Sequence, residues 1–202
     1  MIAIIDYGMG NLRSVQKSLE RLGVEAIVTS DPDLIRKASK LILPGVGHFA
    51  MGMNNLNQKG LSEIIQEEVV KKNKPLLGIC LGMQLLTCYS EEGDVDGLGL
   101  IEAQTLRFPS FNWDFHVPHM GWNKISPVKE SKLCYGIDCK SLMYFVHTYY
   151  VKCADSKDIL FKTKYGVEFD SGFEHENIAG FQFHPEKSHK AGLQLLQNFI
   201  KK

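Results

Sequence analysis

The chain has 202 residues, of which 44% are hydrophobic and 23% charged, a balance typical of a globular domain in water. Lys and Arg together number 23, as do Asp and Glu, so the zero net charge argues against a nucleic-acid-binding or anionic-membrane surface. The opening MIAIIDYGMG has no basic region and only a short apolar run, so we expect neither a signal peptide nor a membrane span. Five cysteines without framework spacing favour a reducing cytoplasm, and the length predicts one domain over residues 1–202.

The first half of the chain alternates between strand and helix patterns. Apolar runs predict buried strands at 1–6, 24–28, 40–45 and 75–79. Helices are predicted between them at 12–22, 31–38 and 61–73, with Asn11 capping the first and Ser62 the last. Continuous apolar strands separated by helices indicate a mostly parallel sheet that is covered on both faces.

The second half has a different character. Strand-like segments with turns between them lie at 105–108, 144–151, 158–165 and 177–183, and a final helix is predicted at 191–200. We interpret these strands as an antiparallel extension of the parallel sheet. The predicted fold is therefore an α/β protein, a three-layer α/β/α sandwich of the flavodoxin-like kind.

Cys80 lies where the strand at 75–79 meets an apolar segment, 81–89, that is predicted to be a helix. The sequence Gly78-Ile-Cys80-Leu-Gly82 is the cysteine version of a nucleophile elbow, in which glycines let the strand and the helix approach closely. A thiol at a helix N-terminus is favoured as the thiolate, and the N–H of Leu81 is available to an oxyanion. The alternative interpretation is a buried structural cysteine.

A thiol nucleophile needs a base, and His184 lies at the end of a strand-like run. In an extended chain His184 and Glu186 point to the same side, so the carboxylate can orient the imidazole while the imidazole accepts the thiol proton. Alone, the His-Pro-Glu tripeptide is equally compatible with a surface turn.

The combination of GICLGMQ at 78–84 and FQFHPEKS at 181–188 resembles the class I (triad) glutamine amidotransferases. Further stretches resemble, within that family, the glutaminase subunits of imidazole glycerol phosphate synthase in histidine biosynthesis. These stretches are IIDYGMGNLRS, LPGVGHF, VPHMGWN and YFVHTYY, at 4–14, 43–49, 117–123 and 144–150.

The resemblance implies hydrolysis of glutamine to glutamate and ammonia without a metal or an organic cofactor. The implied catalytic triad is Cys80, His184 and Glu186. The family's glutamine-binding positions match Gln84, Glu92, His147 and Thr148. Its oxyanion donors match Leu81 and, in the strand PGVG, Val46 and Gly47.

The resemblance also implies a partner, a (β/α)8-barrel cyclase that forms a heterodimer with the glutaminase and receives its ammonia. The cyclase converts the phosphoribulosyl formimino derivative of aminoimidazole carboxamide ribotide (PRFAR) into imidazole glycerol phosphate and aminoimidazole carboxamide ribotide (AICAR). Family likeness places Asn11, Trp122 and Lys187 near the docked face.

Several alternatives remain open at this point. An aromatic run at 108–115 serves either packing or docking. Because of this run, a second function remains possible, that of a related glutaminase that feeds an amidotransferase acting on a bacterial surface sugar. A catalytically silent scaffold on the same fold is a further alternative. The opening DYGMGN fails the dinucleotide fingerprint because Arg13 replaces the third glycine. The Cys and His spacings predict no zinc site, and Cys88 is expected in the core.

Overall fold

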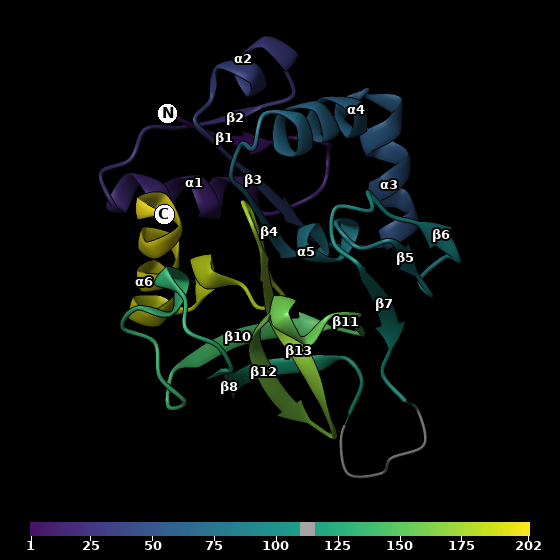
Figure 1. Ribbon diagram of the computed structural model, residues 1–202, viewed down its shortest axis with the longest axis vertical. Helices are drawn as coiled ribbons and strands as arrows, with labels where there is room; N and C mark the ends of the chain where they lie inside the picture. Colours follow the sequence, from purple (N-terminus) through teal and green to yellow (C-terminus); the bar gives the residue numbers. More distant parts are fainter. Residues whose placement is uncertain (110–115) are drawn as a thin grey trace.

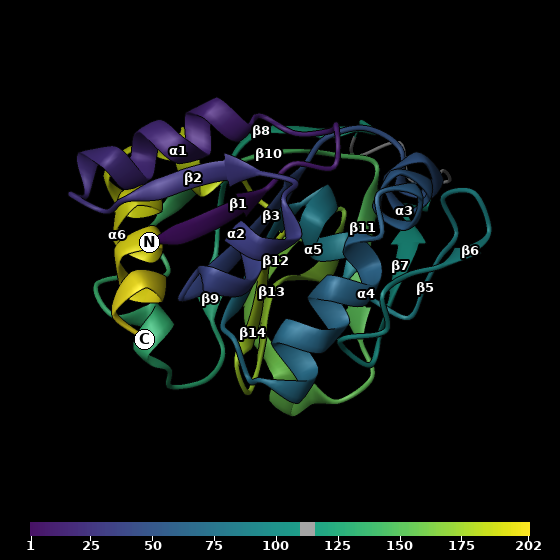
Figure 2. The same ribbon diagram turned by 90° about the horizontal axis from the view of Figure 1, so that it is seen from above.

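The computed structural model describes residues 1–109 and 116–202 as helices packed on both faces of one large mixed sheet (Figures 1 and 2). Five neighbouring strands of that sheet run parallel. In spatial order they are β2 (Ala26–Thr29), β1 (Ile2–Ile5), β3 (Lys40–Gly45), β4 (Leu76–Cys80) and β14 (Ile178–Phe181). Four of them are apolar and buried along nearly their whole length, as expected for parallel strands covered on both faces.

The helices divide between the two faces of the sheet, each with its own apolar core. One core contains side chains of α1 (Leu12–Arg21) and α6 (His189–Lys201). The other contains side chains of α2 (Pro32–Lys37), α3 (Phe49–Gln58), α4 (Leu61–Gln66) and α5 (Leu81–Leu85). In Figure 2, α1 and α6 lie on one side of the strands, and α3, α4 and α5 lie on the other. The predicted three-layer α/β class is confirmed.

A mostly antiparallel set of strands extends the sheet beyond β14. The order continues through β13 (Val167–His175), β11 (Tyr149–Cys153), β7 (Ala103–Arg107), β5 (Tyr89–Ser90) and β6 (Val95–Asp96). Within this set β5 runs parallel to β7, and the other neighbours are antiparallel. Strand β12 (Ile159–Tyr165) pairs with β13 and with β9 (Ser126–Pro127). A separate two-stranded sheet joins β8 (His119–Lys124) to β10 (Leu142–His147). Short helical turns lie at η1 (Glu67–Lys71), η2 (Lys132–Cys134), η3 (Ser156–Asp158) and η4 (Pro185–Lys187).

Several sequence expectations about elements were wrong. The segment 144–151 is two strands in two sheets, because the chain leaves β10 at Thr148 and β11 pairs elsewhere. The segment 177–183 does not belong only to the antiparallel part, since β14 runs parallel to β4. The helix at 81–89 ends at Leu85, and α3, β8 and β13 were not anticipated.

Two predicted residue positions also need correction. Ser62 does not cap α4, because Gly60 adopts a left-handed conformation with φ +65° and lets the helix begin directly at Leu61. Cys88 is exposed and not in the core, because it lies just after α5 has ended. The helix predicted at 61–73 changes after Gln66 into the π-helical turn η1.

Candidate active site

The backbone bends sharply at Cys80, between β4 and α5. Cys80 has φ 54° and ψ −113°, a conformation that a non-glycine residue adopts only where the surroundings enforce it. The flanking glycines are required sterically, as expected: a Cβ on Gly82 would lie 1.7 Å from the carbonyl oxygen of Leu43, and one on Gly78 would lie 2.7 Å from the carbonyl oxygen of Gly82. The elbow therefore depends on two glycines that bring β3, β4 and α5 into backbone contact.

His184 and Glu186 meet behind the elbow. The Nδ1 of His184 lies 2.8 Å from the Oε1 of Glu186, and their side chains are 2% and 1% exposed. The sequence predicts that the two side chains meet because the chain is extended there. They meet instead because residues 185–187 form the turn η4. The Nε2 of His184 has no hydrogen-bond partner among the described residues.

The electrostatic environment favours the protonated form of His184. Burial lowers the pKa of His184, but the negative charge of Cys80 and the hydrogen bond with Glu186 outweigh burial and raise the pKa to about 10. A cationic imidazole between a sulfur and a carboxylate is the arrangement that a thiol nucleophile and its base require.

A cavity of about 280 Å³ opens in front of Cys80. It is lined by every oxyanion and glutamine-binding position that the family resemblance implied: Val46, Gly47, Leu81, Gln84, Glu92, His147 and Thr148. Pro118, Val146 and Tyr149 complete the lining. Residues from the segment after β3, from α5 and from the β10–β11 junction thus converge on one thiol.

Main-chain segments line this cavity on two sides. Leu81 is the first residue of α5, and Val46 and Gly47 directly follow β3, whose Gly45 lies opposite Cys80 in the sheet register. The N–H groups of these three residues donate to no other residue in the described part of the chain. An N–H group that no other residue engages can stabilise negative charge beside the sulfur once it is turned toward the cavity.

Two side chains present acceptors to the cavity. The Nε2 of Gln84 donates to the carbonyl oxygen of Tyr149 and to the Oε1 of Gln182, both at 3.0 Å, which leaves the amide oxygen of Gln84 as its free acceptor. One carboxylate oxygen of Glu92 accepts from the N–H of Phe49 at 2.8 Å and so holds the side chain in place. A carboxylate beside an amide oxygen suits an ammonium group.

A chain of neutral histidines supports the far wall of the cavity. The Nδ1 of His147 donates to the carbonyl oxygen of Tyr149 at 2.7 Å, so its Nε2 accepts from the Nδ1 of His119 at 2.9 Å. The Nε2 of His119 in turn accepts from the amide of Asn123 at 3.3 Å. Burial lowers the pKa of His147 to about 3 and that of His119 to about 4, so both remain neutral donors and acceptors.

Two residues of this site escaped the sequence analysis. Gln182 is fully buried, and its Nε2 lies 3.9 Å from the sulfur of Cys80. The strand alternation that places Gln182 on the same side as His184 was a usable signal. His119 had no local signal, because its contact with His147 comes from the β8–β10 pairing.

The three residues expected at a partner surface are exposed. Trp122 stacks on His189 with ring centroids 5.0 Å apart, and Lys187 Nζ lies 5.6 Å from the ring centroid of Tyr144. Asn11 precedes α1 but its side chain makes no capping hydrogen bond. Within the aromatic run at 108–115, Phe108 is buried against other rings, and the positions of Phe111, Trp113 and Phe115 lie outside the described residues.

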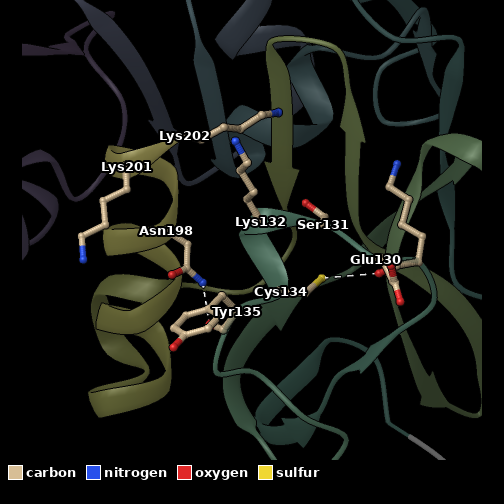
Figure 3. A pocket seen from close by; sticks show the side chains of 9 residues that line it. Glu130, Ser131, Lys132, Cys134, Tyr135, Asn198, Lys201 and Lys202 are labelled. Atoms are coloured by element: carbon tan, nitrogen blue, oxygen red, sulfur yellow. Dashed lines mark hydrogen bonds between the residues drawn. The ribbon is translucent and has the colours of Figure 1, made fainter.

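A larger cavity, of about 720 Å³, lies between η2 and α6, away from Cys80 (Figure 3). Two of its polar side chains are engaged elsewhere: Lys129 donates to two main-chain carbonyls, and Asn198 donates to those of Leu133 and Tyr135. In Figure 3 the side chain of Lys201 points away from Cys134 and Tyr135. This cavity therefore lacks the convergent chemistry of the smaller one.

The described residues lack two further features. None of their helices is long and apolar enough to cross a membrane. The same residues contain no group of three or more His, Cys, Asp or Glu side chains arranged to hold a metal ion.

Comparisons with solved structures agree with this fold. Solved structures of similar fold include a glutamine amidotransferase, with a TM-score of 0.78, 17% identity and coverage of 100% of this chain and 98% of that one. The structure of PurLQS from Thermotoga maritima matches with a TM-score of 0.76 and 18% identity, over 99% of this chain and 97% of that chain.

Relatives found by their sequences are much more similar to this chain than these solved structures are. A protein of Methanococcus maripaludis named "Imidazole glycerol phosphate synthase subunit HisH 2" is 54% identical, over 100% of this chain and 99% of its own. A Pseudomonas aeruginosa protein of the same name is 48% identical over 99% and 98%, and an Archaeoglobus fulgidus HisH subunit is 45% identical over 99% and 98%. The family "Glutamine amidotransferase class-I" matches residues 3–202. The chain therefore belongs to the class I glutamine amidotransferases and, within them, to the HisH subunits of imidazole glycerol phosphate synthase.

Proposed function

We propose that this chain hydrolyses glutamine with the triad Cys80, His184 and Glu186 and delivers the ammonia to a separate cyclase subunit. That subunit, a (β/α)8 barrel, uses the ammonia to make imidazole glycerol phosphate and AICAR from PRFAR in histidine biosynthesis. The observation that carries the proposal is the single small cavity in which the thiol, the main-chain donors and the acceptor side chains converge, with His184 and Glu186 held behind the thiol. The family match over residues 3–202 supports treating the chain as one amidotransferase domain.

The chemistry is amide hydrolysis through a thioester. The sulfur of Cys80 attacks the side-chain carbonyl of glutamine, and the N–H groups of Leu81 and Val46 or Gly47 stabilise the resulting oxyanion. His184 gives its proton to the departing ammonia and then removes a proton from the water that releases glutamate. Glu186 holds the imidazole through its Nδ1 throughout. Every step uses groups of the chain itself, and no metal or organic cofactor is needed.

The cavity also explains recognition of a free amino acid. The acceptor oxygens of Gln84 and Glu92 bind the α-ammonium group, and the main chain around His147 and Thr148 receives the α-carboxylate. The histidine chain behind this wall fixes the position of the Tyr149 carbonyl, to which Gln84 also donates. A glutamine held at its α-carbon by these groups extends its carboxamide toward Cys80.

A docked partner is required by the chemistry of the product, because ammonia released into neutral water becomes ammonium, which is not a nucleophile. The named relatives are subunits of a synthase, as expected for such a division of labour. Near the cavity, Val46, Met120 and Trp122 are 40%, 61% and 46% exposed, and so offer an apolar face for docking. Asn11 and Lys187 complete the proposed contact face. The expected location is the cytoplasm.

The test is glutamate release by the purified chain, alone and then with the cyclase and its acceptor. We expect very little hydrolysis by the isolated chain, because the segment with Val46 and Gly47 holds its donor away until the partner docks. Supplying one oxyanion donor raises turnover by about a hundred- to a thousand-fold, and we expect at least that stimulation. Lys187→Ala is expected to reduce the stimulation more than it weakens glutamine binding.

The same measurement separates the alternatives. Stimulation by PRFAR with a barrel cyclase supports the histidine pathway. Stimulation only by a surface-sugar amidotransferase would replace the proposed acceptor, and absence of turnover with every partner would indicate a silent scaffold. Full activity in the isolated chain would contradict the partner switch but leave the triad intact.

A further inference from the structure

Tyr7 carries a buried hydroxyl that no other described residue satisfies. Its side chain is fully buried, and its Oη has no hydrogen-bond partner among the described residues. An unsatisfied buried polar group costs about 1–3 kcal/mol, so its presence calls for a reason. Burial, and then the charge of Cys80, raise the pKa of Tyr7, so the group remains a protonated donor.

The hydroxyl lies at the junction between the oxyanion segment and the elbow. A Cβ on Gly45 would lie 2.2 Å from Tyr7 Oη, and it would also lie 2.9 Å from the N of Gly82 and from the Cβ of Leu81. The Tyr7 hydroxyl therefore occupies the space beside the Gly45 backbone, one residue before Val46.

The loop after β1, residues 7–10, lies alongside residues 44–47. A Cβ on Gly10 would lie 3.2 Å from the carbonyl oxygen of Pro44, and a Cβ on Gly47 would lie 2.7 Å from the Cε of Met9. Residues 7–10 thus approach residues 44–47 at three points, and at those three approaches Tyr7 supplies the only side-chain donor.

Tyr7 and the thiol lie on opposite sides of this segment. Tyr7 belongs to the apolar core that contains Leu43 and Leu81, whereas Cys80 belongs to the core on the other face of the sheet and opens into the cavity. The carbonyl and N–H of a planar trans peptide point in opposite directions. When the Gly45 carbonyl turns toward Tyr7, the N–H of Val46 consequently turns toward the cavity.

We propose that Tyr7 is a positioning residue for the oxyanion site, whose hydroxyl donates to the Gly45 carbonyl when the Gly45–Val46 peptide presents the Val46 N–H to the cavity. This inference rests on the proposed glutaminase function and identifies what holds its second donor in place. The hydrogen bond forms only in the active orientation, so it favours turnover and leaves ground-state binding of glutamine unaffected.

Tyr7→Phe tests this inference because it removes only the hydroxyl. In the complex with the cyclase and its acceptor we expect kcat for glutamine to fall by about 5-fold, the effect of one net hydrogen bond, with KM unchanged. The rate at which iodoacetamide alkylates Cys80 should match wild type, since the thiol and His184 are intact. The melting temperature should stay equal or rise, because an unsatisfied polar group has been removed.

Tyr135→Phe is the matched control, because the Tyr135 side chain is 77% exposed and remote from the cavity. A kcat of Tyr7→Phe equal to that of wild type and Tyr135→Phe would overturn the inference. A raised KM or slowed alkylation would also overturn it, because the hydroxyl would then act on binding or on the thiol. Failure of the proposed function is a different result, namely no glutamate release by the wild-type complex.

Discussion

The parallel and antiparallel halves of the sheet make different contributions to the site. The parallel half supplies Cys80, Leu81 and the segment after β3, all fixed by backbone contacts between neighbouring elements. The junction between the small β8–β10 sheet and the antiparallel half supplies the wall at His147 and Thr148, which is held by side-chain hydrogen bonds to β8 and β11. The groups that carry out the reaction are thus held by backbone contacts, whereas the wall that binds glutamine is held by side-chain hydrogen bonds. We therefore expect substitutions in the first set to change mainly kcat and substitutions in the second set to change mainly KM.

The largest effect is expected in the parallel half. Cys80→Ala should abolish glutamine hydrolysis, since loss of a triad nucleophile typically reduces turnover about a million-fold. The cyclase reaction should continue when an ammonium salt is supplied at high pH. Circular dichroism and the melting temperature check that the fold is retained, and hydrolysis persisting in the pure variant would contradict the assignment of Cys80.

His184 and Glu186 provide the next largest effect. His184→Ala should be nearly as damaging as loss of the thiol, whereas Glu186→Gln should retain more activity, because it orients the base and does not itself accept the proton. Alkylation of Cys80 by iodoacetamide should slow in the His184 variant. An unchanged alkylation rate would mean that His184 does not activate the thiol.

Glu92 tests the glutamine-binding side of this comparison. It lines the same cavity as Cys80 but is proposed to bind the α-ammonium group, away from the reacting bond. Glu92→Gln should raise KM for glutamine by about 10- to 100-fold, the effect of losing a charge-assisted interaction with the α-ammonium group. The value of kcat should change much less. Steady-state kinetics check this, and a fall in kcat at constant KM would place Glu92 in the chemistry instead.

The smallest effect concerns stability in acid. In the unfolded chain His119 has the ordinary pKa of 6.5, but in the folded protein burial lowers its pKa to about 4. Below pH 6.5 the unfolded state therefore binds a proton that the folded state does not, and stability falls as the pH falls toward 4.

His119→Gln keeps a donor for His147 but cannot titrate. Between pH 7 and pH 5 it should lose about 1–2 kcal/mol less of its free energy of unfolding than wild type loses. Urea denaturation at the two pH values measures this difference. His116→Gln changes an exposed side chain and should lose as much free energy of unfolding as wild type. An equal loss in wild type, His119→Gln and His116→Gln would contradict a buried, neutral His119.

The same division explains what the sequence could predict. Four strands of the parallel half, the elbow around Cys80 and the need for Gly78 and Gly82 follow from local patterns. The fifth strand, β14, was assigned to the antiparallel extension, because its pairing with β4 joins segments that are far apart in the sequence. The pairing of His119 with His147 and the break at Thr148 depend on which distant strands meet, which no local pattern specifies. The glutamine-binding and partner positions came from the family likeness, and their roles remain predictions.

Tyr7 shows the same limit at a single residue. Its sequence neighbourhood contributed to the family resemblance and failed the dinucleotide fingerprint, but neither pointed to a role for Tyr7. The unsatisfied hydroxyl beside Gly45 became visible only once β1 and β3 were adjacent.

The central claim is that Cys80 forms the covalent intermediate, and trapping that intermediate tests it most directly. The wild-type complex is quenched with acid during turnover of glutamine, digested and analysed by peptide mass spectrometry. The account predicts a γ-glutamyl thioester on the peptide that contains Cys80, and its accumulation relative to free enzyme should change in Glu186→Gln. A γ-glutamyl group on Cys88, Cys134, Cys139 or Cys153, or turnover without any labelled cysteine, would contradict it.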